Sequence, residues 1–248
     1  MSDSDYDDRT ARHYAAYRPP LHEPLLRTCL QGRYAAGLDV GCGTGHSTRA
    51  LRAYCDRVTG IDPSEAMLSR APVTAGIDYL PFDGRRFPFP AGSFDVITFA
   101  GSLFYAKSPQ LLREVERVGR AGGVVVVYDY LTPSAELAER LLGIRAPATD
   151  VPAYDHTVTF DDLHPTVLRH RESQSGRMKV SMGPGELANL LLSERPLRDV
   201  LRSAYGAADL PSRVESALHA ALPEGAQTVD AVFRVFTAVY FIGTRNKR

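Results

Sequence analysis

The sequence predicts an α/β protein whose mostly parallel sheet is covered by helices on both faces. Between residues 36 and 130, short apolar runs alternate with segments of helical periodicity. Such alternation is typical of parallel strands joined by crossover helices, whose sheet is buried on both faces. The composition agrees, because 44% of the 248 residues are hydrophobic and 23% are charged, as in ordinary globular chains.

Five apolar runs are the expected strands of this part: 38–40, 58–61, 77–82, 94–99 and 124–130. Helices are expected between them near 46–55, 64–71 and 109–118. The last is the clearest, because its leucines and valines recur on one helical face. Ser108 is a suitable N-cap, Pro109 suits the first turn, and Gly119 ends the periodic run.

The remaining segments are less regular. A helix is expected from Pro24 to about Gly32. Beyond residue 131 the alternation stops: 143–165 is rich in loop-forming residues, 166–182 has β-like stretches, and helices are expected near 186–193, 197–204 and 210–221. The tail 229–244, rich in Val, Phe and Tyr, is expected to return to the sheet as one or two strands. Residues 131–222 are therefore expected to form a lid over the sheet rather than a separate domain.

Charge and cysteine usage narrow the class of protein. Lys plus Arg and Asp plus Glu both number 29, so the basic excess typical of nucleic-acid binders is missing. No apolar run approaches the ~18 residues needed to cross a bilayer, and the acidic first ten residues do not resemble a signal peptide. Three cysteines (Cys29, Cys42 and Cys55) without a CxxC pair favour free thiols in the reducing cytoplasm. No binding to nucleic acid or membrane is expected.

The most informative segment is a glycine-rich turn between a strand and a helix. Gly41, Gly43 and Gly45 allow a sharp turn and a close approach to a ligand, in front of the free N–H groups of a helix N-terminus. A dinucleotide fingerprint requires a third glycine where His46 stands. The pattern therefore favours a ligand without a pyrophosphate, and a purely structural turn is the alternative.

Two acidic residues follow at later strand ends. Asp62 lies 21 residues after Gly41, the offset at which a carboxylate reaches the two hydroxyls of a ribose. Its alternative role is a helix N-cap in front of Pro63. Asp83 is a candidate acceptor for an adenine amino group, or a plain turn residue with Gly84.

At these residues the sequence resembles the class I S-adenosylmethionine-dependent methyltransferases of small-molecule type. The resemblance covers about residues 13–130 and the β-rich tail. The segments that carry it are HYAAYRPPLHEPLL (13–26), LDVGCGTG (38–45), VTGIDPSEAML (58–68), FPAGSFDVITFAGSLFY (89–105) and LLREVERVGRAGGVVVVYDY (111–130). It implies a Rossmann-like, seven-stranded, mostly parallel sheet with helices on both faces. It divides the chain into an N-terminal helical segment over the cofactor (1–35), a cofactor-binding core (36–130), a substrate lid (131–222) and C-terminal strands (223–248).

The resemblance also implies S-adenosylmethionine as cofactor and assigns residues to it. The loop under its methionine part would comprise Gly41, Cys42, Gly43 and Gly45. Ala100 would lie along the same part, near the ammonium group. Arg18 would pair with the cofactor carboxylate, although a surface position explains it nearly as well.

For the nucleoside part, the resemblance places the ribose hydroxyls at Asp62. Pro63 and Met67 would line the adenine. Asp83 would meet the adenine amino group, with Phe82 beside it.

Residues at the carboxyl ends of the strands are the candidates for chemistry, because ligands bind there in open α/β sheets. Catalytic candidates are Asp129, Tyr14 and His156. Substrate candidates are Tyr17, Ser102, Phe104, Tyr105, Tyr130 and His164. A base is required only if the methyl acceptor is protonated; a structural partner for a lid residue is the alternative for Asp129, and ordinary packing for the tyrosines. No metal-ligand spacing is seen.

The expected function is methyl transfer to O, N or C of a small organic molecule. A catalytically silent cofactor-binding scaffold and a nicotinamide-dependent oxidoreductase are the alternatives. His46 in place of the third glycine disfavours the oxidoreductase, and the balanced charge disfavours a methyltransferase acting on RNA.

Overall fold

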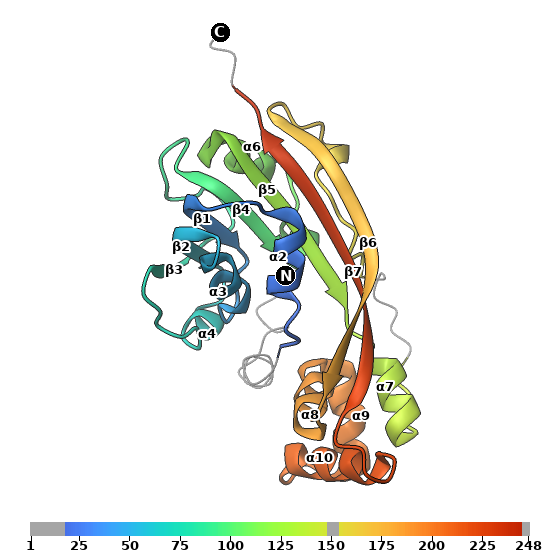
Figure 1. Cartoon of the computed structure of the whole chain (residues 1–248). Coiled ribbons are helices and arrows are strands. Elements are labelled where there is room, and N and C mark those ends of the chain that lie inside the picture. The colour runs from blue at the N-terminus through green and yellow to red at the C-terminus, as the bar shows by residue number, and fades with distance from the viewer. Residues whose placement is uncertain (1–17, 148–153, 245–248) are drawn as a thin grey trace. The chain divides into compact units, whose positions relative to one another are not determined.

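The computed structural model describes residues 18–147 and 154–244. Seven strands form one sheet in the order β3-β2-β1-β4-β5-β7-β6 (Figure 1). Their bounds are Tyr34–Val40 (β1), Cys55–Asp62 (β2), Ile77–Pro81 (β3), Phe94–Ala100 (β4), Gly119–Leu131 (β5), Leu168–Met182 (β6) and Val229–Ile242 (β7). Strands lie at all five expected apolar runs, and both later β-like segments are strands. The predicted seven-stranded α/β fold is confirmed.

The four strand pairs from β3 to β5 are parallel, and β1 lies in their middle. Val40 at the end of β1 is in register with Ile61 of β2 and with Phe99 of β4. Ala100 at the end of β4 is in register with Tyr128 of β5. β7 runs opposite to β5, which makes the sheet mixed (Figure 1). The carboxyl ends of β1, β2, β4 and β5 therefore meet along one edge, where the loops that follow them converge.

The helices of the described chain are α2 (His22–Cys29), α3 (His46–Arg52), α4 (Glu65–Leu68), α5 (Leu103–Ala106), α6 (Pro109–Val118), α7 (Ser134–Leu142), α8 (Pro184–Ser193), α9 (Arg195–Tyr205) and α10 (Leu210–Ala221), with a 3-10 turn at Asp161–Leu163. The sequence predicts the bounds of α6 and α10 residue for residue. α3 and α4 are shorter than expected, and α5 and α7 were not expected. Segment 148–153 of the loop-rich stretch lies outside the described residues.

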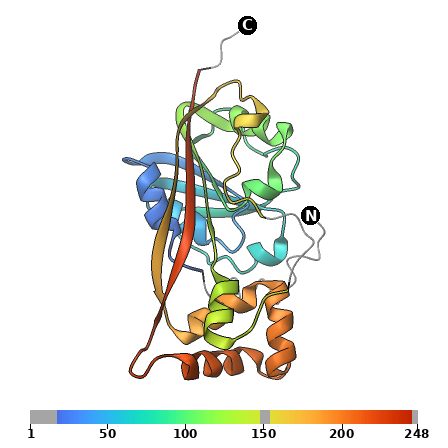
Figure 2. The same ribbon diagram turned by 90° about the vertical axis from the view of Figure 1, so that its right-hand side faces the viewer.

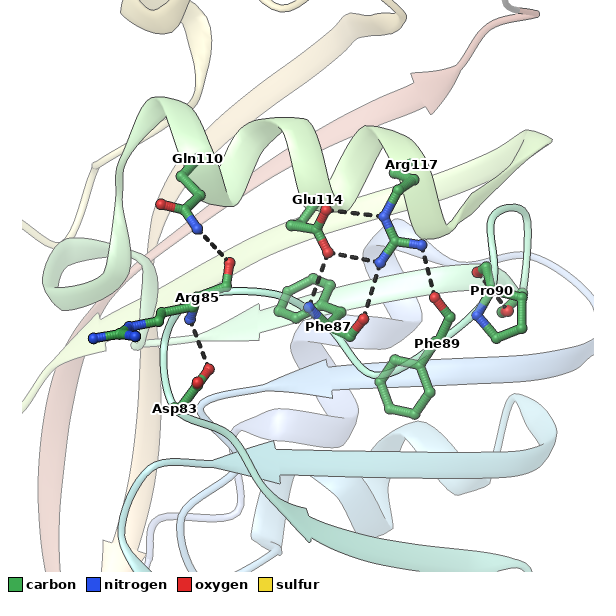
Figure 3. A network of polar contacts seen from close by, with 9 residues as sticks. Asp83, Arg85, Phe87, Phe89, Pro90, Gln110, Glu114 and Arg117 are labelled. Atoms are coloured by element: carbon green, nitrogen blue, oxygen red, sulfur yellow. Dashed lines mark hydrogen bonds and ion pairs between the residues drawn. The ribbon is translucent and has the colours of Figure 1, made fainter.

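Helices cover both faces of the sheet, as the alternating pattern predicts. α6 buries its apolar stripe (Leu111, Leu112, Val115 and Val118) against Ile97, Phe99, Val125 and Val127. Figures 1 and 3 show α2 and α3 on the opposite face. Neighbouring residues of one strand point to opposite faces, so Val96 and Thr98 are buried on the side away from α6. Parallel strands buried on both faces explain the near-continuous apolar runs in the sequence.

A buried carboxylate fixes the chain where it enters β6. Glu116, in the last turn of α6, is 6% exposed. It accepts hydrogen bonds from the N–H groups of Thr166, Val167 and Leu168 at 2.6, 2.7 and 3.3 Å, and from the Thr166 hydroxyl at 2.7 Å. The helix thereby holds three consecutive backbone groups, of which those of Val167 and Leu168 are buried and would otherwise have no partner.

The described chain divides into two compact units. One holds residues 20–130, 154–176 and 235–244, and the other holds 18–19, 131–147 and 177–234. The division falls within the long strands β6 and β7, so each unit contains part of both. In the second unit, α7 to α10 pack together beside these strand segments (Figure 2). The role of residues 131–222 as a substrate lid stays a prediction.

We expect Glu116→Ala to lower the free energy of unfolding by about 3 kcal/mol, because it leaves the buried N–H groups of Val167 and Leu168 without an acceptor. Urea unfolding followed by circular dichroism measures the change. Glu23→Ala is the control, since Glu23 forms an exposed ion pair with Arg27, and it should cost less than about 1 kcal/mol. Equal losses in the two variants would contradict the anchoring role of Glu116.

Candidate functional site

The glycine-rich segment turns the chain from β1 into α3. The N–H groups of Gly41 and Cys42 both donate to the Ile61 carbonyl of β2, at 2.8 and 3.1 Å. Gly41, Gly43 and Gly45 have φ angles of +73°, +53° and +79°. Side-chain-bearing residues rarely adopt these left-handed conformations, so this loop requires glycine at all three positions. α3 begins at the next residue, and its N-terminus follows directly on the loop.

Close packing fixes the first of these glycines against the end of β4. A Cβ on Gly41 would lie 2.4 Å from Cβ of Ser102. The Ser102 hydroxyl in turn donates to the Val40 carbonyl at 2.5 Å. The ends of β1 and β4 are thus joined through Ser102. This predicted substrate residue has a structural contact, and its role toward a substrate stays a prediction.

A buried aspartate that was not among the predicted site residues holds this turn. Asp39 is fully buried in β1. Its Oδ2 accepts from the hydroxyls of Ser47 and Thr48 in α3, at 2.6 and 2.7 Å, and its Oδ1 accepts from Thr98 of β4 at 2.8 Å. Burial raises the pKa of Asp39, and the three hydroxyl donors oppose the rise. The sequence does contain a signal for this role of Asp39: it is a carboxylate inside an apolar run, and Ser and Thr follow eight and nine residues later.

Asp62 joins the glycine loop to the end of β2. Its Oδ2 accepts from the Gly43 N–H and its Oδ1 from the Ser64 N–H, both at 2.8 Å. Asp62 is not the helix N-cap, because the Ser64 hydroxyl caps α4 by accepting from the Met67 N–H at 3.3 Å. Burial raises the pKa of Asp62, and the two backbone N–H groups partly offset the rise. Pro63 between these residues is exposed.

The loop also buries a hydroxyl group without a protein partner. Oγ1 of Thr44 is completely buried and has no hydrogen-bond partner within the described part of the chain. An unsatisfied buried hydroxyl costs about 1–3 kcal/mol. Such an atom inside a strand-to-helix turn points to a ligand that supplies the missing contact.

The segment after β3 lies beside Asp62. The Phe82 N–H donates to the Asp62 carbonyl at 3.1 Å, and the Phe82 ring packs on Phe87 with 4.9 Å between centroids. Asp83 is exposed and accepts from the Arg85 N–H at 2.9 Å, so it forms the turn that was the alternative to an adenine contact. The contact of Asp83 with adenine stays a prediction.

α6 holds this segment from one side (Figure 3). Glu114 accepts from the Phe87 N–H at 2.8 Å. Arg117 donates to the carbonyls of Phe87 and Phe89 at 2.9 and 2.7 Å, and pairs with Glu114 at 2.6 Å. The Arg117 guanidinium lowers the pKa of Glu114. The backbone after Phe82 is therefore fixed by a helix and does not depend on a bound ligand.

A second group of polar and aromatic side chains lies where β4 and β5 end. The Tyr154 hydroxyl donates to Oδ2 of Asp129 and also lies 3.1 Å from the Gly101 carbonyl oxygen. The Tyr154 ring contacts Phe104 and Tyr105 with centroid separations of 4.7 and 5.7 Å. Three predicted residues (Phe104, Tyr105 and Asp129) thus meet at Tyr154, which sequence reasoning missed because its surroundings show no periodicity.

The remaining predicted site residues are more scattered. Ala100 ends β4 and is half-buried, next to this group. Tyr130 is buried, and its ring meets His22 edge-on at 6.0 Å between centroids. His156 is half-buried, two residues after Tyr154. Arg18 belongs to the second compact unit, and Tyr14 and Tyr17 lie outside the described residues.

His164 is separate from these side chains. It is exposed and ends the 3-10 turn with a φ of 51°. Nearby Thr166 is bound to Glu116 in the last turn of α6. Val167 follows Thr166, and its carbonyl accepts a hydrogen bond from the N–H of Gly243, just past β7, at 2.8 Å. Two residues before His164, Asp162 pairs at 2.5 Å with Lys107, which directly follows α5. The role of His164 toward a substrate stays a prediction.

Within the described ranges 18–147 and 154–244, no group of three or more His, Cys, Asp or Glu side chains is placed to hold a metal ion. No helix in the same ranges is both long and apolar enough to cross a membrane.

Comparison with known proteins identifies the region that carries the site. Residues 38–127 match the family described as a methyltransferase domain. A malonyl-[acyl-carrier protein] O-methyltransferase of Erwinia pyrifoliae is 37% identical over 123 residues, which cover 48% of this chain and 47% of that protein. The chain spans about half the length of the curated relatives it matches first.

Solved structures share the fold over most of the chain. A putative type II methyltransferase from Anaeromyxobacter dehalogenans superimposes with a TM-score of 0.65 at 21% identity, covering 92% of this chain and all of that one. A phosphoethanolamine N-methyltransferase of Haemonchus contortus, determined with S-adenosylhomocysteine, gives 0.54 at 17% identity, covering 98% of this chain and 58% of that one. At these identities the likeness shows the fold alone.

We expect Gly41→Ala to destabilise the protein more than Gly84→Ala does. Both glycines have a left-handed φ, but an added Cβ meets Ser102 at the first position and nothing within 4 Å at the second. The second variant should cost about 1–2 kcal/mol of backbone strain, and the first should exceed it. Thermal unfolding measures both. Partial rescue of Gly41→Ala by Ser102→Gly is expected, and equal losses in the two single variants would refute the steric argument.

The raised pKa of Asp62 predicts how its replacement changes stability with pH. An acid whose pKa is raised by folding makes the folded state less stable as pH rises above the unfolded value of about 3.9. The stability of Asp62→Asn relative to wild type should therefore increase from pH 4 upward and level off above the folded pKa of Asp62. Urea unfolding between pH 4 and pH 8 measures this difference. A difference that decreases with pH would show that Asp62 has a lowered pKa.

Proposed function

We propose that this chain methylates an oxygen, nitrogen or carbon atom of a small organic molecule. It belongs to the class I S-adenosylmethionine-dependent methyltransferases through its domain at residues 38–127. The observation that carries the proposal is the junction of the glycine loop with Asp62, next to the side chains gathered at the ends of β4 and β5. One edge of the sheet thus offers a place for a nucleoside and a place for an acceptor.

The residues of this edge fit the family's cofactor, S-adenosylmethionine. When bound, it supplies a methyl group on a positively charged sulfur, a good leaving group. Asp62 would hold the ribose hydroxyls, because each carboxylate oxygen keeps a further lone pair beside its backbone bond. The buried Thr44 hydroxyl supplies an unused polar contact in the same loop. The acidic character of Asp39 and Asp62 suits a cation. Pro63, Met67 and Phe82 remain the proposed adenine contacts.

The chain's own contribution to the reaction is mainly positioning. Holding two reacting groups in line can lower a barrier by up to about 7–11 kcal/mol, and a sulfonium needs little further activation. The exposed rings of Phe104 and Tyr105 support an acceptor with an apolar or flat part. Asp129 is the proposed proton acceptor where the attacking atom carries a proton.

A small acceptor agrees better with the balanced charge than a nucleic acid does, because nucleic-acid binding requires a basic surface. The relative that methylates a malonyl-[acyl-carrier protein] supports acyl or other metabolite-like acceptors. The three cysteines are free and buried, which supports the cytoplasmic setting inferred from the sequence.

We expect S-adenosylhomocysteine to bind with a Kd on the order of micromolar, about −8 kcal/mol, and Asp62→Ala to weaken binding at least about tenfold through the lost ribose contacts. Isothermal titration calorimetry measures both. Asp56→Ala, which alters an exposed carboxylate at the other end of β2, is the control and should bind as wild type does.

The proposal fails if the wild type does not bind, or if the Asp62 variant binds equally well. Binding of NADH instead would favour the oxidoreductase. Transfer of labelled methyl groups to small acceptors separates an enzyme from a catalytically silent scaffold.

A further inference from the structure

We propose that Asp129 and Tyr154 form a proton-accepting pair, and that the methyl acceptor therefore presents an O–H or N–H group. The inference rests on the methyltransferase function proposed above and narrows its substrate class.

The pair is defined by one hydroxyl group between two acceptors. The Tyr154 hydroxyl lies within hydrogen-bond distance of Oδ2 of Asp129 and 3.1 Å from the Gly101 carbonyl oxygen. A phenol has a single proton, so it donates to one of these acceptors at a time. The other oxygen of Asp129, Oδ1, accepts from the Tyr130 N–H at 2.7 Å. Among the donors to Asp129 are thus one that is fixed in the backbone and one that is free to rotate.

This arrangement accommodates both charge states of Asp129. While the carboxylate is ionised, the Tyr154 hydroxyl donates to it. Once Oδ2 carries a proton, it donates to the Tyr154 oxygen, and the Tyr154 hydroxyl turns to the Gly101 carbonyl. Oδ2 of Asp129 and the Tyr154 hydroxyl stay bonded to each other in both states, so taking up a proton leaves neither of them unsatisfied, which would cost about 1–3 kcal/mol. A purely structural tyrosine–carboxylate bond requires no second acceptor.

The position of the pair places it beside an acceptor. Gly101 directly follows β4, and Asp129 lies near the end of β5, at the edge where ligands bind in such sheets. Phe104 and Tyr105 contact the Tyr154 ring, and their side chains are 36% and 49% exposed. These surfaces suit a planar or apolar group that carries the reacting atom.

The O–H or N–H bond of the acceptor breaks and its proton passes to Oδ2 of Asp129. The electron pair left on the acceptor forms the bond to the methyl carbon, and the pair of the methyl–sulfur bond stays on sulfur. An acceptor that is already a thiolate has no proton to lose and gains nothing from the pair.

This difference supplies the test. Transfer of labelled methyl from S-adenosylmethionine is measured on catechol, benzylamine and thiophenol, the last of which is ionised at neutral pH. For catechol or benzylamine, we expect Tyr154→Phe to lower kcat about tenfold or more with KM and S-adenosylhomocysteine affinity within about twofold. Any turnover of thiophenol should be spared. Asp129→Asn should lower kcat further. Tyr34→Phe, at the amino end of β1, should match wild type.

Four results would overturn the pair. In the first, Tyr154→Phe leaves kcat for catechol and benzylamine unchanged. In the second, it lowers kcat for thiophenol equally. In the third, it acts through KM or cofactor affinity. In the fourth, a wild type that binds S-adenosylhomocysteine methylates only thiophenol or none of the three probes. By contrast, a wild type that does not bind S-adenosylhomocysteine contradicts the proposed function itself, so the two failures are distinguishable.

Discussion

The site depends on the fully buried carboxylate of Asp39. It accepts hydrogen bonds from the first turn of α3 and from the middle of β4, and it thereby fixes the glycine loop at both its strand and helix sides. A charge without water would cost several kcal/mol, and the three hydroxyl donors offset that cost. Burial raises the pKa of Asp39, and the hydroxyl donors oppose that rise. The structure thus retains a buried carboxyl group that joins β1 to α3 and β4 on either side of the glycine-rich turn.

From this turn, a chain of short contacts extends along the edge of the sheet. The glycine loop is bonded to β2 through Ile61 and Asp62, and the segment after β3 is bonded to Asp62 in turn. On the other side, Ser102 joins the ends of β1 and β4. The candidate cofactor contacts and the candidate acceptor contacts lie on the same parallel strands, so a single rigid scaffold holds both groups of side chains.

Local signals in the sequence predict well what local forces decide. The bounds of α6 follow from a serine cap, a proline in the first turn and an apolar stripe, all within eleven residues. The left-handed glycines and the proximity of Asp62 to the loop follow from the spacing of motifs at neighbouring strand ends. α7 was not predicted, although its sequence has good helix formers, because it lies beyond the part of the chain in which strands and helices alternate.

Contacts between distant segments could not be predicted in this way. Asp39 and Thr98 are 59 residues apart, and Tyr154 meets Asp129 from an irregular stretch 25 residues later. Neither pairing leaves a periodic trace in the sequence. The N-cap role that was the alternative for Asp62 belongs instead to Ser64, which lies two residues later and has the right geometry.

A crystal structure of the protein with S-adenosylhomocysteine tests the central claim most directly. The account predicts ribose hydroxyls within hydrogen-bond distance of the Asp62 carboxylate, the amino-acid part above the turn from Gly41 to Gly45, and the sulfur facing Asp129 and Tyr154. A nucleoside bound at another edge of the sheet, or a ribose that does not contact Asp62, would contradict it.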